Sequence, residues 1–152
     1  MRALVQRVKQ AKVTVAGDTV GEIGVGLLVF LGITISDTIE DVDWLVEKVV
    51  HLRIFDDASG RLQHDVRDIG GKLLVVSQFT LYGEARRGRR PDFALAAPAM
   101  MAEPLYQRFL SGCRQILSVE TGIFGADMDV SLVNWGPVTI WVESPRSGKT
   151  VE

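Results

Sequence analysis

Two stretches toward the C-terminus alternate between apolar and polar residues, which is the pattern of β-strands with one buried face. They run over residues 127–134 and 138–142, and Gly136-Pro137 lies between them. Because proline lacks the N–H group that a sheet ladder uses, this dipeptide predicts an edge, a bulge or a turn. An ordinary Gly-Pro turn is one interpretation. The other is a cis bond whose glycine lets bare backbone approach a ligand closely.

Two other stretches, 27–31 and 72–76, are apolar almost without interruption and predict strands buried on both faces. Gly17-Asp18 predicts a hairpin turn. Further short strands are predicted over residues 4–8, 12–15, 19–23 and 61–66.

Apolar residues at helical spacing predict two helices. In the first, Asp37 is the expected N-cap and Glu40 reaches back to it, as in an acidic variant of the capping box. The second helical region follows Arg89-Pro91, and Pro98 and Pro104 are expected to interrupt it. The predicted buried faces carry Val42, Leu45, Val49 and Leu52 in the first helix, and Leu105, Phe109, Cys113 and Ile116 in the second.

Length and composition place these elements in one domain. The chain has 152 residues, of which 47% are hydrophobic and 24% charged, which is ordinary for a globular protein with a sizeable core. Two sheets of mostly antiparallel strands with two main helices predict the α+β class. We expect a single domain over residues 1–144 and a polar tail over residues 145–152.

Composition also narrows the class of function. A net charge of −2 argues against nucleic-acid binding by a globally basic surface. The single cysteine, Cys113, allows no intrachain disulfide, suits a reducing cytoplasm and is interpreted as core filling. The N-terminal residues lack a signal-peptide pattern, and the longest apolar run, 25–35, is too short to span a membrane. We therefore expect a cytoplasmic protein without membrane contact.

The sequence indicates neither a metal site nor a cofactor site. The two histidines, His51 and His64, lie in separate segments, and no cysteine–histidine cluster has ligand spacing. The acidic residues around position 40 are interpreted as favourable charges at a helix N-terminus. The glycines around Gly24 lack the spacing of a dinucleotide-binding loop.

A local cluster of positive charge is nevertheless present. Arg86, Arg87, Arg89 and Arg90 occupy four of five consecutive positions. Arginine forks suit bidentate contact with phosphate, which predicts a nucleic-acid backbone as partner. A solvated loop, paired internally with Glu84 and Asp92, is the alternative.

Polar groups appear where the buried strand 72–76 ends, at Ser77, Gln78, Phe79 and Thr80. Polar groups that enter a core without hydrogen bonds cost about 1–3 kcal/mol each. This segment is therefore either a satisfied structural network or the wall of a site. A nucleophile elbow is absent from the sequence, and neither hydroxyl has an evident base beside it.

Ser77-Gln78-Phe79-Thr80-Leu81 and Asn134-x-Gly136-Pro137-Val138-Thr139 together resemble the two signature motifs of D-aminoacyl-tRNA deacylases, also called D-tyrosyl-tRNA deacylases. The resemblance runs from Met1 to about Ser144, and Trp135 stands where the family usually has an acidic residue. Further matching segments, in the same order as in the family, are Val5–Val8, Leu52–Phe55, Arg89–Phe93 and Thr121–Met128.

The resemblance implies a three-layer β/β/α fold, a homodimer, and an enzyme that hydrolyses the ester of D-aminoacyl-tRNA as a chirality proofreading step in translation. Glycyl-tRNA is an expected second substrate, because glycine has no side chain to exclude. Backbone N–H groups of Phe79 and Thr80 are the candidates for stabilising the oxyanion. Thr80 either attacks the ester itself or orders the pocket while water attacks, and the lack of a base favours the second role.

The remaining candidate residues follow from the same resemblance. Chirality selection is expected from Gly136 and Pro137, supplied across the dimer and oriented by Arg7. Contact with the substrate is expected from Phe124, Met128 and Asn134, and contact with RNA phosphates from Arg86, Arg87, Arg89 and Arg90.

Two other functions stay open on the residues alone. One is a binding module of the same fold that holds tRNA 3′ ends without hydrolysis, which Trp135 beside Gly136 keeps open. The other is a small-ester hydrolase that uses Thr80 or Ser77.

Overall fold

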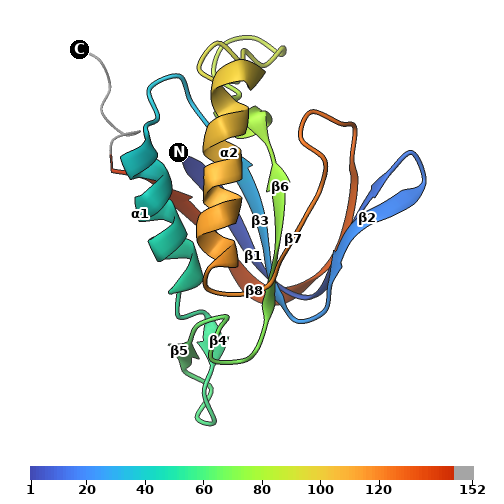
Figure 1. The fold of residues 1–152 in the computed structure, drawn as a ribbon, viewed down its shortest axis with the longest axis vertical. Coiled ribbons are helices and arrows are strands. Elements are labelled where there is room, and N and C mark those ends of the chain that lie inside the picture. Colours follow the sequence, from blue (N-terminus) through green and yellow to red (C-terminus); the bar gives the residue numbers. More distant parts are fainter. Residues whose placement is uncertain (146–152) are drawn as a thin grey trace.

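The computed structural model describes residues 1–145, which form a curled sheet with two helices against one of its faces (Figure 1). The expected tail at 145–152 lies outside the described residues except for Pro145. The strands are β1 (Arg2–Val15), β2 (Asp18–Ile23), β3 (Gly26–Gly32), β4 (Phe55–Asp56), β5 (Leu62–His64), β6 (Lys72–Ser77), β7 (Val119–Thr121) and β8 (Asp129–Glu143). The helices are α1 (Ile39–Val50), the short 3₁₀ helix η1 (Phe79–Tyr82) and α2 (Ala99–Arg114).

The main sheet has the strand order β2-β1-β3-β6-β7, and β8 pairs with the other edge of β1. β1 is antiparallel to β2, β3 and β8, whereas β6 runs parallel to both β3 and β7. β4 and β5 form a separate small hairpin. The mostly antiparallel α+β prediction is confirmed. The parallel part follows from the two helical connections, because α1 lies between β3 and β6 and α2 between β6 and β7.

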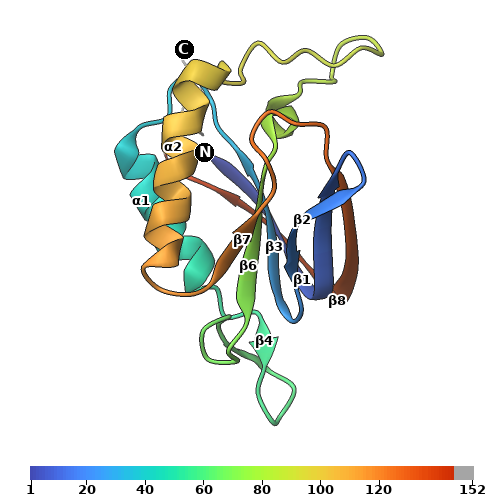
Figure 2. The ribbon, with the colours of Figure 1, turned by 45° about the vertical axis from the view of Figure 1, so that its right-hand side comes forward.

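Two hydrophobic cores lie on opposite faces of β3 and β6. Their alternate residues point to the two faces, as the period of a strand requires. Leu27 and Leu73 face the helices, whereas Leu28 and Leu74 face the distal halves of β1 and β8. Figure 2 shows the resulting order: the helices, then β3 and β6, then β2 with β1 and β8.

β1 and β8 are each longer than the sequence pattern indicates. The expected strands 4–8 and 12–15 form one strand, and those on either side of Gly136-Pro137 form another. The Gly136-Pro137 peptide bond is cis. β1 and β8 pair at Gln6 with Thr139 and next at Val8 with Asn134, so residues 135–138 form a bulge opposite Arg7.

Helix α1 begins one residue later than expected. Thr38 is the N-cap, and the Asp41 carboxylate, at N3, accepts a hydrogen bond from the Thr38 N–H at 3.0 Å. Asp37 is instead engaged by the Met1 ammonium group, 2.6 Å from its Oδ1. The N-cap prediction was wrong because Met1, which is distant in the sequence but adjacent in the fold, occupies the Asp37 carboxylate.

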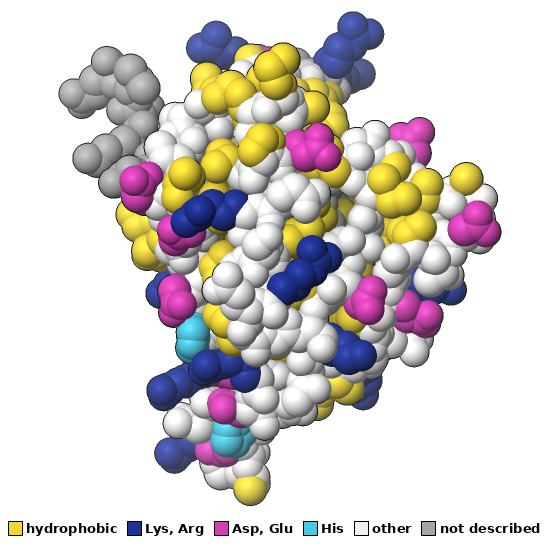
Figure 3. Space-filling view, viewed as in Figure 1, with side chains coloured by type: hydrophobic (Ala, Val, Ile, Leu, Met, Phe, Trp, Pro, Cys, Tyr) yellow, Lys and Arg dark blue, Asp and Glu magenta, His cyan; other side chains and the backbone are white. Residues whose placement is uncertain are grey.

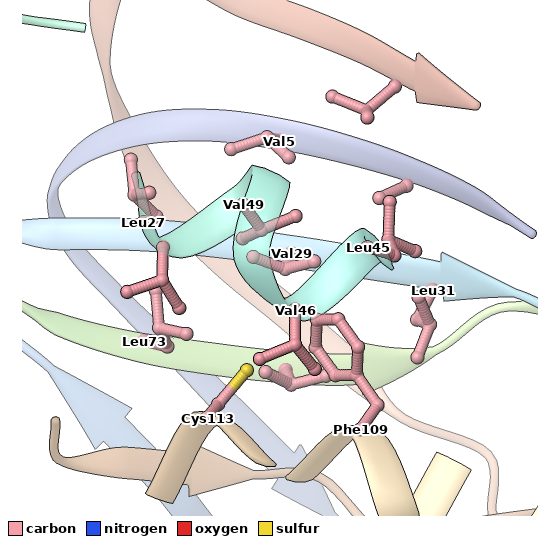
Figure 4. Packing of buried hydrophobic residues seen from close by; sticks show 14 of the residues in the cluster. Val5, Leu27, Val29, Leu31, Leu45, Val46, Val49, Leu73, Phe109 and Cys113 are labelled. Atoms are coloured by element: carbon pink, nitrogen blue, oxygen red, sulfur yellow. The ribbon is translucent and has the colours of Figure 1, made fainter. Parts of the chain in front are cut away.

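Helix α2 begins at Ala99, with Pro98 as its N-cap, and it continues through Pro104. The expected interruption at Pro104 is therefore wrong, and residues 89–98 form no helix. Figure 4 shows Val46 of α1 close to Phe109 and Cys113 of α2 in the core between helices and sheet. Cys113 is fully buried, which raises the pKa of its thiol to about 12 and agrees with core filling.

We predict that Asp41→Asn lowers the free energy of unfolding by about 1 kcal/mol near neutral pH. Burial raises the pKa of Asp41, but hydrogen bonds from Ser144 and Thr38 outweigh it and leave the pKa below its ordinary value of 3.8. A lowered pKa stabilises the fold above that value and ceases to do so as the pH falls through the folded-state pKa. The difference in Tm between the two proteins should therefore shrink below about pH 4. A difference that grows on acidification would contradict this.

Candidate functional site

A cavity of about 460 Å³ opens where β3 and β6 end. Its other walls are the start of α2 and the loop that precedes β8. Most of the lining side chains are apolar, and Asp127 is the charged one among them. The lining residues are Leu31, Ile33, Val76, Ser77, Gln78, Phe79, Ala97, Ala99, Ala102, Phe124, Gly125, Ala126, Asp127, Met128 and Val130.

The parallel pairing of β3 with β6 puts the polar segment at this cavity. Ser77 pairs with Leu31, and the Gln78 N–H donates to the Leu31 carbonyl at 2.8 Å. The chain then turns into η1, which carries Phe79 and Thr80 away from the sheet. Ligands bind at the carboxyl ends of parallel strands in many α/β proteins, and the same geometry is present here.

Two backbone N–H groups at the start of η1 lack an acceptor among the described hydrogen bonds. They belong to Phe79 and Thr80, whereas the next N–H, that of Leu81, donates to the Gln78 carbonyl at 3.2 Å. The first N–H groups of a helix have no partner within the helix. Two donors therefore remain available beside the cavity.

The side chains of this segment show no activated nucleophile. The Gln78 amide donates to the Thr80 hydroxyl, so an amide rather than a base contacts that oxygen. No histidine lines the cavity, and residues 1–145 contain no group of three side chains suited to hold a metal. Phe79 is 57% exposed, and its ring meets Phe93 edge-on with 5.3 Å between centroids.

Phe124 and Met128, two of the expected substrate contacts, do line the cavity. A Cβ atom at Gly122 would collide with the Met128 sulfur, so the absence of a side chain at Gly122 leaves room for the Met128 side chain. Asp127 and the small residues at the start of α2 also line the cavity and were not predicted from the sequence. Asp127 was assigned to a strand from its alternation, but it lies in the loop before β8.

Gly136 and Pro137 lie elsewhere in the same chain, in the bulge of β8. Arg7, which is 3% exposed, donates to the Trp135 carbonyl at 3.0 Å and to the Gly136 carbonyl at 3.3 Å. It also donates to the Ile54 carbonyl at 3.0 Å. Asn134 lies beside this bulge, where its Oδ1 is 3.4 Å from the Gln6 amide, and it does not line the cavity.

The pairing registers separate this bulge from the cavity. Arg7 pairs with Leu27, which pairs with Leu73, whereas Ser77 lies four residues further along β6. Four residues of a strand span about 13 Å, and the bulge is also three strands away from β6 across the sheet. Within one chain, the bulge and the polar segment thus belong to different surfaces.

The four clustered arginines lie on an exposed loop between η1 and α2. Backbone hydrogen bonds between Glu84 and Asp92, at 2.8 and 2.9 Å, close the base of this loop. Within residues 1–145, Arg86 alone among the four forms an ion pair, with Glu84 at 3.6 Å. Figure 3 shows Lys and Arg side chains at the top of the molecule, where Figure 1 places this loop.

Comparison with known proteins gives consistent matches. A family model described as D-Tyr-tRNA(Tyr) deacylase matches residues 4–143. The D-aminoacyl-tRNA deacylase of Thermosipho africanus is 54% identical over 147 residues, covering 96% of this chain and 99% of the relative. That of Halalkalibacterium halodurans is 55% identical over 145 residues, covering 95% and 99%.

Solved structures match as well. A structure named c-Myc DNA Unwinding Element Binding Protein has a TM-score of 0.90 and 44% identity, and the match covers 95% of this chain and 99% of that one. A second, titled "Structural Analysis of a probable eukaryotic D-amino acid tRNA deacylase", has a TM-score of 0.82 at 19% identity and supports the fold alone. The described part of this chain contains no helix long and apolar enough to cross a membrane.

Proposed function

Because this chain belongs to the D-Tyr-tRNA(Tyr) deacylase family and hydrolyses the ester of D-aminoacyl-tRNA, we propose that the ester is cleaved at the cavity where β6 ends. The observation that carries this placement is the pair of N–H groups of Phe79 and Thr80 beside an apolar cavity. Two such donors suit an oxyanion that develops on the ester carbonyl.

The chemistry needs little from the side chains. An aminoacyl ester of tRNA is activated by its neighbouring ribose hydroxyl, so positioned donors and an admitted water are sufficient. Thr80 orders the pocket: its hydroxyl receives a hydrogen bond from the Gln78 amide, and no base contacts it. Ser77, Phe124 and Met128 form the wall against which the substrate lies.

Selection of the D configuration is assigned to Gly136 and Pro137. All four groups on the α-carbon are the same in D and L isomers, so a site distinguishes them by excluding one arrangement. Rigid carbonyls at Trp135 and Gly136, held by Arg7, supply such a barrier and acceptors for the substrate ammonium. Asn134 lies beside the bulge and is assigned to substrate contact together with these two carbonyls. Glycyl-tRNA passes the same barrier, because it lacks a side chain.

The geometry of one chain supports a homodimer as part of this proposal. The bulge and the Ser77–Thr80 segment are about 13 Å apart along the strands and three strands apart across the sheet. The two sets of residues meet only if one subunit supplies the bulge to the cavity of the other. We place this activity in the cytoplasm, where aminoacyl-tRNA is used.

The test is turnover of matched D-tyrosyl-, L-tyrosyl- and glycyl-tRNA by the purified protein, followed with the mass of the dimer in solution. The D and glycyl esters should be hydrolysed and the L ester spared. A free D-tyrosine methyl ester, which lacks ribose and RNA, should react poorly. Equal turnover of D- and L-tyrosyl-tRNA, or a monomer that is fully active, would contradict the proposed site.

The arginine loop should contribute affinity for tRNA. Each phosphate contact contributes about 0.7–0.9 to the slope of log K against log salt, so Arg87→Ala with Arg89→Ala should flatten that slope by roughly 1.5. Filter binding at several salt concentrations measures it. Arg61→Ala with Arg114→Ala is the matched control, because both side chains are exposed and lie between β4 and β5 and at the C-terminal end of α2. Figure 1 shows both of these places at the end of the molecule opposite the loop. Equal slopes for both double variants would mean that the loop arginines are solvated and make no phosphate contact with tRNA.

A further inference from the structure

Trp135 packs against the guanidinium group that holds the bulge. The centre of its ring lies 4.8 Å from Arg7 Cζ, within the range of a cation–π contact. Phe55 meets the same ring edge-on, with 6.2 Å between centroids and an interplanar angle of 74°. Lys9 Nζ lies 5.7 Å from the ring centre. The ring is thus held between the β4 residue Phe55 and cations of β1.

Arg7 donates the side-chain hydrogen bonds that are described between β1 and residues 135–137. The ladder pairs stop at Asn134 and resume at Thr139, so the bulge residues have no ladder partner on β1. Arg7 Nε instead donates to the Trp135 carbonyl, and a terminal nitrogen donates to the Gly136 carbonyl. The directions of these two carbonyls therefore depend on how the Arg7 guanidinium is oriented.

The hydrogen bonds and the ring restrict different motions of that group. Acceptors at Ile54, Trp135 and Gly136, and the Asp56 carboxylate at 3.4 Å, lie around the edge of the guanidinium and fix it within its own plane. Edge contacts resist tilting out of that plane less strongly. An aromatic face stacked on the group opposes the tilt directly.

We infer that Trp135 is a positioning residue for chirality selection, whose ring sets the tilt of the Arg7 guanidinium and thereby the direction of the Gly136 carbonyl. The inference rests on the proposed function, in which these carbonyls exclude L side chains. The Trp135 ring contacts Arg7 and Phe55 rather than a reacting atom, and a substitution of the side chain leaves the Trp135 carbonyl in place. Its effect is on which isomer is accepted rather than on cleavage of the ester.

The experiment measures D- and L-tyrosyl-tRNA turnover for Trp135→Leu and Trp135→Phe. Trp135→Leu should lower the ratio of D to L turnover by about 3- to 30-fold, the range that corresponds to one partly desolvated cation–π contact. Trp135→Phe keeps an aromatic face and should change the ratio by less than about threefold. Trp141→Leu is the matched control, since Trp141 also lies on β8 and stacks on an arginine of β1, Arg2, at 5.6 Å.

The outcomes separate this inference from the proposed function. A wild-type protein that does not discriminate between the isomers overturns the proposed function. A discriminating wild type with an unchanged ratio in Trp135→Leu, or an equal loss in Trp141→Leu, overturns the inference alone. Should Trp135→Leu not fold, nitrogen-edited NMR of the wild type decides: a stacked ring shifts the Arg7 Nε–H proton upfield, and an unshifted proton overturns the inference.

Discussion

Phe79→Pro should hydrolyse D-tyrosyl-tRNA with a kcat about 10²- to 10³-fold below that of Phe79→Ala, the usual effect of losing one oxyanion donor. Proline has no N–H, and Phe79 is the first residue of η1, a position that proline tolerates. Gln78 has φ −146° and ψ 78°, outside the helical region that a following proline disfavours. Single-turnover kinetics with saturating enzyme measures the chemical step.

Phe79→Ala is the reference because it removes the ring from its contact with Phe93 yet keeps the N–H. Equal rates for the two variants would exclude the Phe79 N–H as an oxyanion donor. Thr80→Ala provides the complementary control. It should retain measurable hydrolysis if the hydroxyl only orders the pocket, whereas complete loss in a folded protein, with a covalent adduct at Thr80 in the wild type, would make Thr80 the nucleophile.

Arg7→Ala is expected to produce the largest loss of stability, roughly 2–4 kcal/mol, because it leaves the buried Ile54 carbonyl and the partly buried Trp135 carbonyl without their donor. The two shortest bonds, both 3.0 Å, go to the carbonyls of Ile54 and Trp135, and the side chain is 3% exposed. Urea unfolding measures this loss. Arg7→Lys keeps the charge without the planar fork, and it should lose isomer discrimination with a smaller loss of stability.

Arg2→Ala is the matched control for the stability measurement. Arg2 lies on the same strand and also bonds a carboxylate and a carbonyl, those of Glu143 and Leu81, but it is about a quarter exposed. Exposed ion pairs contribute at most about 1 kcal/mol. If Arg7→Ala is no more damaging than Arg2→Ala, the buried guanidinium is not what holds the bulge to β1.

Much of the fold could be predicted because local signals determine it. The apolar runs at 27–31 and 72–76 became the central strands β3 and β6. The predicted hairpin between β1 and β2 is present, but its two turn residues are Ala16-Gly17, one position earlier than predicted, because Asp18 already pairs with Val15. The apolar face of α1 was predicted from helical spacing, and its residues Val42, Leu45 and Val49 are buried. Each of these depends on periodicity or turn chemistry within a few residues.

The errors arose where distant residues decide. The choice of Thr38 over Asp37 as N-cap depends on the Met1 ammonium, which binds Asp37 across the fold. Pro104 is tolerated because packing of α2 on the sheet outweighs one lost helical hydrogen bond. Motif matching grouped Asn134 with Phe124 and Met128, but strand register places Asn134 at the bulge instead.

β1 contributes residues to both hydrophobic cores, so the unfolding of one core is coupled to the unfolding of the other. Ala3 and Val5 lie in the core under the helices, whereas Val8, Ala11 and Val13 lie in the second core. Arg7 sits at the change from one to the other. Neither layer can come apart without pulling this strand from its partner, so the chain should melt as one cooperative unit, without a stable half-folded form that exposes the edge of the sheet.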